Sequence, residues 1–144
     1  MKTILTLENK IEVKFKNSKL LEEALTHRSF INESKEKNIV NNERLEFLGD
    51  AVIELVVTEY LFNTYPTYNE GELTSFRSAL VRTESLADEA VRLEIGAFIH
   101  MSNGEDNTGG RNRPYILANT FEALIGAIYL DQGYAEVKNF IVTN

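Results

Sequence analysis

The chain has 144 residues, 43% of them hydrophobic and 26% charged, which fits one soluble globular domain spanning residues 1–144. It has no cysteine, so disulfides and thiolate metal sites are excluded, and no apolar run suits a transmembrane helix or a signal peptide. We therefore expect a cytoplasmic protein without membrane contact. The net charge of −7 argues against a basic module that coats RNA, but it is compatible with carboxylates that hold cations.

Helical spacing of apolar residues runs through most of the chain, while proline, glycine and β-branched alternation are sparse. We expect loops over 31–41, which is polar and charged, and over 102–112, which contains three glycines. The predicted fold class is all-α. The predicted helices cover 5–13, 19–27, 41 or 42 to 62, 70–82, 83–93, 114–131 and a last segment from 135.

The predicted helix ends carry suitable residues. Asn17 or Ser18 can cap the second helix, and Thr83 can cap the fifth. Pro114 suits the first turn of its helix, and Gly133 suits the position just after the last turn.

The long central helix carries a stripe of carboxylates. At about 100° per residue, Glu43, Glu46 and Asp50 fall within about 60° of one another. The apolar set of this helix lies on the other side and comprises Leu45, Leu48, Val52, Leu55 and Val56. Like charges at this spacing repel. Either a hard cation such as Mg²⁺ offsets the repulsion, or the stripe is a solvated acidic face near Lys or Arg.

The helix predicted over 114–131 has a matching pattern. Asn119 and Glu122 lie on adjacent turns of one face, and Gly126 returns to nearly the same direction. Gly49, in the middle of the carboxylate helix, costs about 1 kcal/mol relative to alanine, which suggests that another backbone approaches there. The two helices could therefore hold Glu46, Asp50, Asn119 and Glu122 around one metal site, or simply pack through small residues.

Phe47 falls outside the apolar arc, beside the carboxylates. An exposed aromatic at this position would anchor a partner, and the alternative is burial under the 31–41 loop. His27 and His100 lack metal-ligand spacing and are expected to be structural or solvated. Arg111 and Arg113 follow a glycine-containing loop and either contact phosphate or cover the surface.

The segment Asn42–Val52, NERLEFLGDAV, resembles the signature of the ribonuclease III family over its full length. Further segments agree in the same order, so the similarity runs from about residue 5 to residue 141. They are THRS at 26–29, EGELT at 70–74, ALV at 79–81 and ILANTFEALIGAIYLD at 116–131.

The resemblance implies an all-α, homodimeric nuclease domain that cuts double-stranded RNA with Mg²⁺, for which Mn²⁺ is expected to substitute. By position, Glu46, Asp50, Asn119 and Glu122 would surround the metal, with Glu46, Asp50 and Glu122 in catalytic roles. Glu43 and Glu70 match acidic residues that line the RNA valley, and Phe47 matches the aromatic that enters a socket of the partner subunit. The implied products carry a 5′-phosphate and a 3′-hydroxyl with a short 3′ overhang, as in the processing of rRNA and mRNA precursors.

This sequence departs from the family pattern in two respects. Asn119 stands where many members carry Asp, and its amide oxygen is a ligand without negative charge. The double-stranded-RNA-binding domain that usually follows is not expected within 1–144. Two rival interpretations remain, a non-catalytic RNA-binding scaffold of the same fold and an all-α nucleotide pyrophosphohydrolase.

Overall fold

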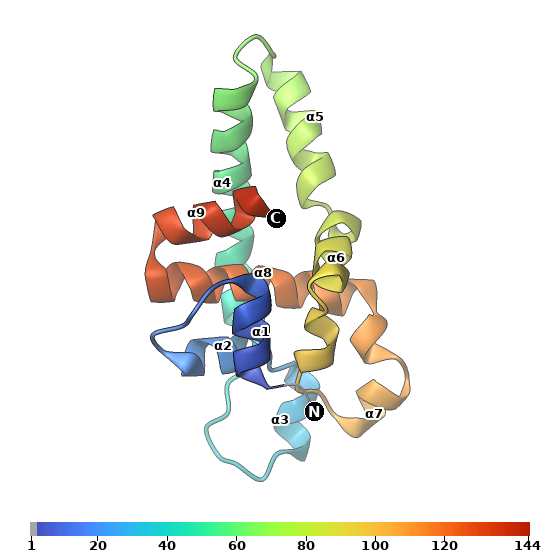
Figure 1. The fold of residues 1–144 in the computed structure, drawn as a ribbon. Coiled ribbons are helices and arrows are strands. Elements are labelled where there is room, and N and C mark those ends of the chain that lie inside the picture. The colour runs from blue at the N-terminus through green and yellow to red at the C-terminus, as the bar shows by residue number, and fades with distance from the viewer. Residues whose placement is uncertain (1–2) are drawn as a thin grey trace.

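The computed structural model describes residues 3–144, and these form an all-α fold without named strands (Figure 1). The expected fold class is therefore confirmed. Two short 3₁₀ turns, η1 (Ile95–Phe98) and η2 (Gly110–Asn112), connect helices. The helices are α1 (Ile4–Ile11), α2 (Ser18–Ala24), α3 (Arg28–Glu33), α4 (Glu43–Thr64), α5 (Glu70–Val81), α6 (Thr83–Arg92), α7 (Asn103–Asn107), α8 (Pro114–Gln132) and α9 (Tyr134–Thr143).

Helix α8 is the centre of the fold, because it is buried on almost every side between α4, α6, α2 and α9. Its contact with α4 is the most extensive in the domain. Two glycines permit this contact. A Cβ on Gly49 would lie 1.7 Å from the carbonyl oxygen of Glu122, and one on Gly126 would lie 2.4 Å from the carbonyl oxygen of Leu45. The close backbone approach predicted from Gly49 is thus confirmed.

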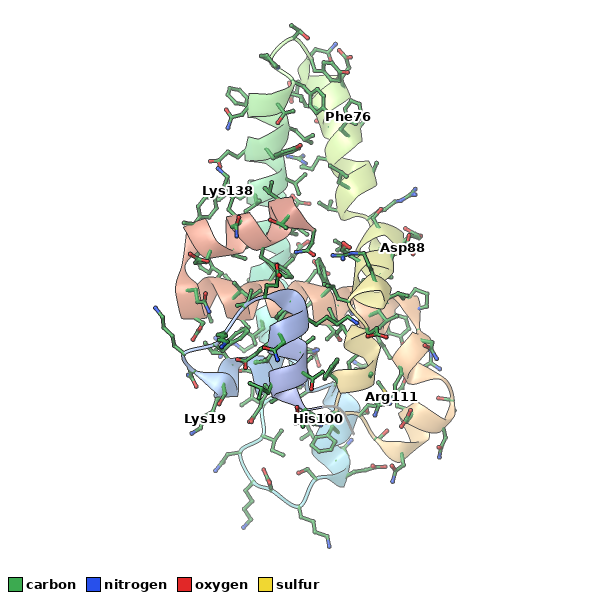
Figure 2. The ribbon with its side chains drawn as sticks, viewed as in Figure 1. Lys19, Phe76, Asp88, His100, Arg111 and Lys138 are labelled. Carbon is green, nitrogen blue, oxygen red and sulfur yellow. The ribbon has the colours of Figure 1, made fainter. Side chains whose placement is uncertain are left out.

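Helices α4 and α5 form a hairpin that projects from the rest of the domain (Figure 1). Helix α5 has no buried residue, and the rings of Tyr65, Tyr68 and Phe76 stack on one another. Phe76 lies near the tip of the hairpin (Figure 2). Leu55, predicted to belong to the apolar face of α4, is instead 56% exposed. The prediction was wrong because the buried face of α4 is turned away from Leu55: its neighbours Ile53, Val56 and Val57 are buried, and Leu55 lies on nearly the opposite side of the helix from Val57.

Two predicted loops contain short helices. Helix α3 overlaps the start of the 31–41 segment, and the His27 side chain caps it by accepting from the Ser29 amide. Helix α7 lies within 102–112, and the Ser102 hydroxyl caps it by accepting from the Glu105 amide. Side-chain caps thus let polar segments form a single helical turn or two, which apolar periodicity does not reveal.

Helices α2 and α6, which correspond to the second and fifth helices expected from the sequence, also differ from expectation. Helix α2 ends at Ala24, rather than at 27, because the next backbone groups pair elsewhere: His100 N donates to Leu25 O, and His27 N donates to His100 O. Asn17 caps α2 as predicted, by accepting from the Lys19 amide. Thr83 is the first residue of α6, not its cap, and Arg82 holds the cap position without a side-chain hydrogen bond.

Candidate active site on helices α4 and α8

The predicted carboxylates of α4 and α8 meet in one surface hollow. It has a volume of about 400 Å³ and is lined by Glu43, Glu46, Phe47, Asp50 and Glu122. We call it the acidic hollow. Glu43 and Glu46 lie in the first turn of α4, where the positive end of the helix dipole favours negative charge. The glycine contact between α4 and α8 brings Glu122 up to this stripe.

Asn119 lines a neighbouring pocket rather than the acidic hollow itself. This pocket has a volume of about 180 Å³ and shares Glu43 and Glu46 with the hollow. We call it the rim pocket. Its lining consists of His27, Arg28, Asn42, Glu43, Glu46, Tyr115, Ile116, Asn119 and Thr120. Asn119 thus shares a pocket with Glu43 and Glu46, but it does not line the hollow that holds Asp50 and Glu122.

The hollow raises the pKa of two of its carboxyl groups. Burial raises the pKa of Glu122 to about 8, and a hydrogen bond with Asp50 and the charges of Asp50, Glu46 and Glu54 act in the same direction. Burial also raises the pKa of Glu46, with repulsion from Glu43 and Asp50 adding to it. These shifts mean that the ionised carboxylates repel one another in a partly desolvated place.

No Lys or Arg side chain in the described part of the chain forms an ion pair with these carboxylates. These carboxylates are thus unpaired among residues 3–144, although Arg28 lines the pocket next to them. Across residues 3–144, no three His, Cys, Asp or Glu side chains converge closely enough to hold a metal ion as they are placed. Glu122 and Asp50 share a hydrogen bond, but no third such side chain of residues 3–144 joins them closely enough.

The comparisons with known proteins agree with this geometry. A family model described as ribonuclease-III-like matches residues 17–144. The chain belongs to the ribonuclease III family. Ribonuclease 3 of Clostridium tetani is 55% identical over 138 residues, which are 96% of this chain and 58% of that protein. Ribonuclease 3 of Bacillus cytotoxicus is 52% identical over 93% of this chain and 55% of its own length. The chain thus spans little more than half the length of these curated family members.

Solved structures of the family share the fold. The ribonuclease III nuclease domain of Campylobacter jejuni matches with a TM-score of 0.91 at 46% identity, covering 98% of this chain and 94% of that one. For that protein, structural flexibility is described in a region involved in dimer formation. Dicer from Pichia stipitis matches with a TM-score of 0.64 at 27% identity over 89% of this chain and 53% of that one. The expected ribonuclease III nuclease-domain fold is therefore confirmed.

The family resemblance also singled out Glu70 and Phe47. Glu70 lies apart from the carboxylates, and Phe47 points away from the core. Glu70 begins α5 at the far end of the hairpin, about 20 Å from Asp50 along the axis of α4. It does not join the acidic hollow of its own chain. Phe47 is 83% exposed at the edge of the hollow, so the alternative of burial under the 31–41 segment is wrong.

The sequence did not single out Glu54, and it left the roles of the two histidines and of Arg111 and Arg113 undecided. Glu54 raises the pKa of Glu122, and its position four residues after Asp50 extends the predicted stripe. His27 is tied into the structure through its Nδ1, which lies 2.7 Å from the Ser29 hydroxyl. Arg111 and Arg113 form ion pairs with Asp106 and Glu105 respectively, which favours a structural role for both.

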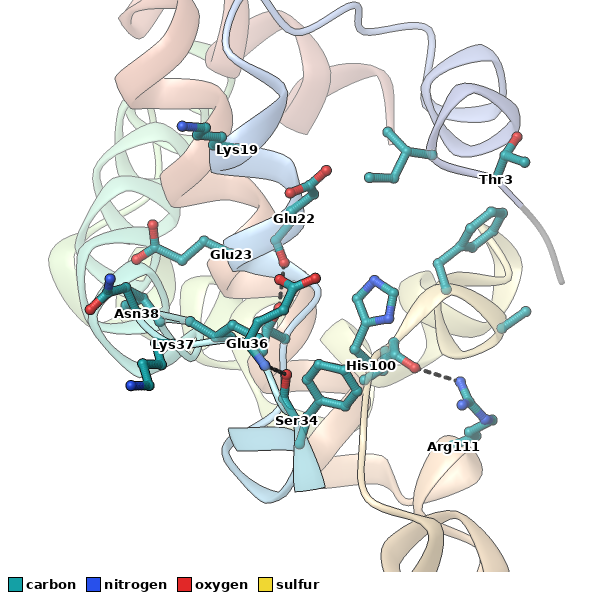
Figure 3. A pocket seen from close by; sticks show the side chains of 18 residues that line it. Thr3, Lys19, Glu22, Glu23, Ser34, Glu36, Lys37, Asn38, His100 and Arg111 are labelled. Carbon is teal, nitrogen blue, oxygen red and sulfur yellow. Dashed lines mark hydrogen bonds between the residues drawn. The ribbon is translucent and has the colours of Figure 1, made fainter. Parts of the chain in front are cut away.

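A cavity larger than the acidic hollow lies elsewhere, between α1, α2, the 34–40 segment and η1 (Figure 3). Its volume is about 840 Å³, and Lys19, Glu22, Glu36, Lys37 and other residues of both charges line it. The charges of opposite sign offset one another, and the Arg111 guanidinium is committed to the carbonyl oxygens of Gly96 and Ile99. This cavity therefore lacks the uncompensated charge that distinguishes the acidic hollow. No helix among residues 3–144 is both long and apolar enough to cross a lipid bilayer.

Proposed function

We propose that this chain is the nuclease part of a divalent-cation-dependent endoribonuclease that hydrolyses phosphodiester bonds of double-stranded RNA. The observation that carries the proposal is the gathering of Glu46 and Asp50 from α4 and Glu122 from α8 in one hollow, where no cationic side chain of residues 3–144 pairs with them. Family membership supports the reaction class. Because the chain spans little more than half of its curated relatives, the activity is a proposal and not a property carried over.

The donor set of the hollow fits Mg²⁺, with Mn²⁺ as a substitute. Carboxylate and amide oxygens are the ligands that Mg²⁺ takes in proteins, usually together with several waters. Glu46, Asp50 and Glu122 would hold the ion directly, and Asn119 would orient one of its waters from the rim pocket. The raised pKa of Glu122 supports this assignment, because a bound cation would offset the repulsion that now favours the protonated form. When bound, the cation neutralises the phosphate and lowers the pKa of an attacking water.

The residues of this chain would have three tasks in that reaction. The backbone contact between Gly49 and Glu122 fixes the two halves of the carboxylate set against each other. Glu122 and Asp50, when ionised, would be proton acceptors beside the scissile bond. Glu43, exposed at the mouth of the hollow, would line the path of the RNA backbone. We expect products with a 5′-phosphate, a 3′-hydroxyl and a short 3′ overhang, and a role in processing rRNA and mRNA precursors.

A homodimer would complete the site. Phe47, 83% exposed beside the carboxylates, would enter a socket of a second copy, and Glu70 would reach the valley of the pair rather than its own hollow. The projecting hairpin carries further apolar surface at Leu55, Phe62 and Leu80, which a second copy would cover. Exposed apolar surface of this kind is typical of an interface.

The decisive experiment is digestion of a long RNA duplex with Mg²⁺ by the unchanged protein and by Glu122→Gln. We expect cleavage by the first and a loss of at least about a hundredfold in the second, since removing one group that stabilises transition-state charge commonly costs that much. Glu136→Gln is the matched control, because Glu136 is an exposed carboxylate on α9 outside both pockets, and it should cleave normally.

Three outcomes would contradict the proposal. Equal cleavage by the unchanged protein and Glu122→Gln would point to a contaminating nuclease. Binding of the duplex without a cut would favour a non-catalytic scaffold. Hydrolysis of nucleoside triphosphates without any cut in RNA would favour a pyrophosphohydrolase.

A further inference from the structure

The rim pocket contains a cationic side chain that the structure leaves without a partner. Arg28 is exposed, and its guanidinium forms no hydrogen bond or ion pair within residues 3–144. It lines the same pocket as Glu43 and Glu46 and still does not pair with either of them. In a domain of net charge −7, a free arginine at the edge of the acidic hollow is the unusual feature.

The other arginines show how unusual this is. Five of them donate to protein groups: Arg77 to Thr58, Arg82 to Ser85, Arg92 to Glu89, Arg111 to Asp106 and Arg113 to Glu105. Within the described residues, only Arg28 and Arg44 lack such a partner. Arg44 neighbours Glu23 electrostatically and lines neither the rim pocket nor the acidic hollow. Arg28 is therefore the guanidinium available to a ligand at the site.

The remaining lining of the rim pocket offers neutral polar groups and one aromatic ring. The His27 ring accepts the Ser29 amide at Nδ1, which leaves Nε2 as its N–H donor, and burial lowers the pKa of His27 so that the ring stays neutral. Tyr115 is 50% exposed and lies one helical turn before Asn119 on α8. A guanidinium, an N–H donor and a half-exposed ring are suited to a phosphate joined to a ribose.

The position of the pocket indicates which phosphate it would take. The rim pocket and the acidic hollow share Glu43 and Glu46 as a common wall, so a strand whose scissile phosphate lies in the hollow places a flanking nucleotide in the rim pocket. A carboxylate wall repels a phosphate unless a cation offsets it, and Arg28 is the protein cation in place to do so. An arginine fork also binds phosphate oxygens in pairs, which fixes orientation as well as attraction.

We infer that the rim pocket is a subsite for the RNA nucleotide next to the cut, with Arg28 as the positioning residue that binds its phosphate. This inference rests on the proposed ribonuclease function. Arg28 holds the strand in register with the hollow and takes no part in bond breaking. Its removal should therefore weaken RNA binding and raise KM, with kcat nearly unchanged.

The test measures binding of a fluorescent RNA duplex by anisotropy over a series of salt concentrations in Mg²⁺, in a Glu122→Gln background that binds without cutting. The variants are Arg28→Ala, Arg28→Lys and the matched control Arg44→Ala, which removes an equally unpaired arginine from another face. We expect Arg28→Ala to bind roughly tenfold more weakly, the size of one charge-assisted hydrogen bond to phosphate. The slope of log K against log salt should fall by about one. Arg28→Lys should keep the slope, and Arg44→Ala should match its parent.

Steady-state cleavage by Arg28→Ala in the otherwise unchanged protein supplies the second measurement, and its melting temperature should equal that of the parent. If the parent cleaves duplex RNA but Arg28→Ala and Arg44→Ala have the same affinity and salt slope, this inference is overturned and the proposed function stands. If the unchanged protein neither binds nor cleaves duplex RNA, both fall together.

Discussion

Replacing Gly49 by alanine tests whether the contact of α4 with α8 assembles the site. The added Cβ would lie 1.7 Å from the carbonyl oxygen of Glu122, 2.6 Å from its carbonyl carbon and 3.0 Å from the amide nitrogen of Gly126. All three are backbone atoms, so no side-chain rotation relieves the overlap. Ordinary van der Waals contact begins near 3.4 Å, and the helices must therefore separate locally by well over 1 Å.

The magnitude follows from two opposing effects. Overpacking of a rigid core costs about 1–3 kcal/mol or more, and a clash between backbones belongs at the upper end. The helix propensity of alanine returns about 1 kcal/mol. The net loss should be at least about 2 kcal/mol, a fall in Tm of roughly 5–10 °C for a domain of this size. Because the displaced atoms belong to Glu122 itself, cleavage should fall about a hundredfold even where the protein remains folded.

The assay combines thermal unfolding with RNA cleavage well below Tm. Gly71→Ala on α5 is the matched control, since its Cβ would meet only the Asn69 side chain at 3.4 Å. That variant should be as stable as the unchanged protein or slightly more stable, with full activity. Gly126→Ala, whose Cβ would lie 2.4 Å from the carbonyl oxygen of Leu45, should resemble Gly49→Ala. A Gly49→Ala protein with unchanged Tm and cleavage would refute the reasoning.

Three more predictions concern the site and its edge. Burial raises the pKa of Glu122 from 4.5 to about 8, so in EDTA its stabilising protonation is complete below about pH 4.5 and is lost as the pH rises to about 8. The Tm should therefore fall over this pH range, and Glu122→Gln should reduce that fall. Parallel curves of Tm against pH for the two proteins would contradict this prediction. Asn119→Asp adds a negative charge beside the site and should lower the Mg²⁺ concentration for half-maximal cleavage, whereas an unchanged requirement would mean that the neutral amide does not weaken Mg²⁺ binding. Phe47→Ala should shift sedimentation toward the monomer at nearly unchanged helicity, and an unaltered dimer would dismiss Phe47 as an anchor.

The tertiary structure explains why some expectations from the sequence failed. Apolar periodicity predicted the long helices, because each buries a stripe against neighbours, but it missed α3 and α7, which depend on single caps from His27 and Ser102. It also placed Leu55 in the core, since a periodic pattern does not reveal which side of the helix its neighbours cover, and they cover Ile53, Val56 and Val57 instead. The end of α2 was predicted too late for a related reason, namely the pairing of 25–27 with His100 across the fold.

The sequence by itself determined the helices, the carboxylate stripe of α4 and the glycine that had to meet another backbone, because these depend on spacing along one helix. Only the tertiary structure decided that Glu122 reaches Glu46 and Asp50, that Glu70 does not, and that Arg28 stands unpaired in the rim pocket. Contacts between residues far apart in the chain depend on how helices cross. The charge and burial of the site depend on how α4 and α8 cross, and the sequence of neither helix alone shows this.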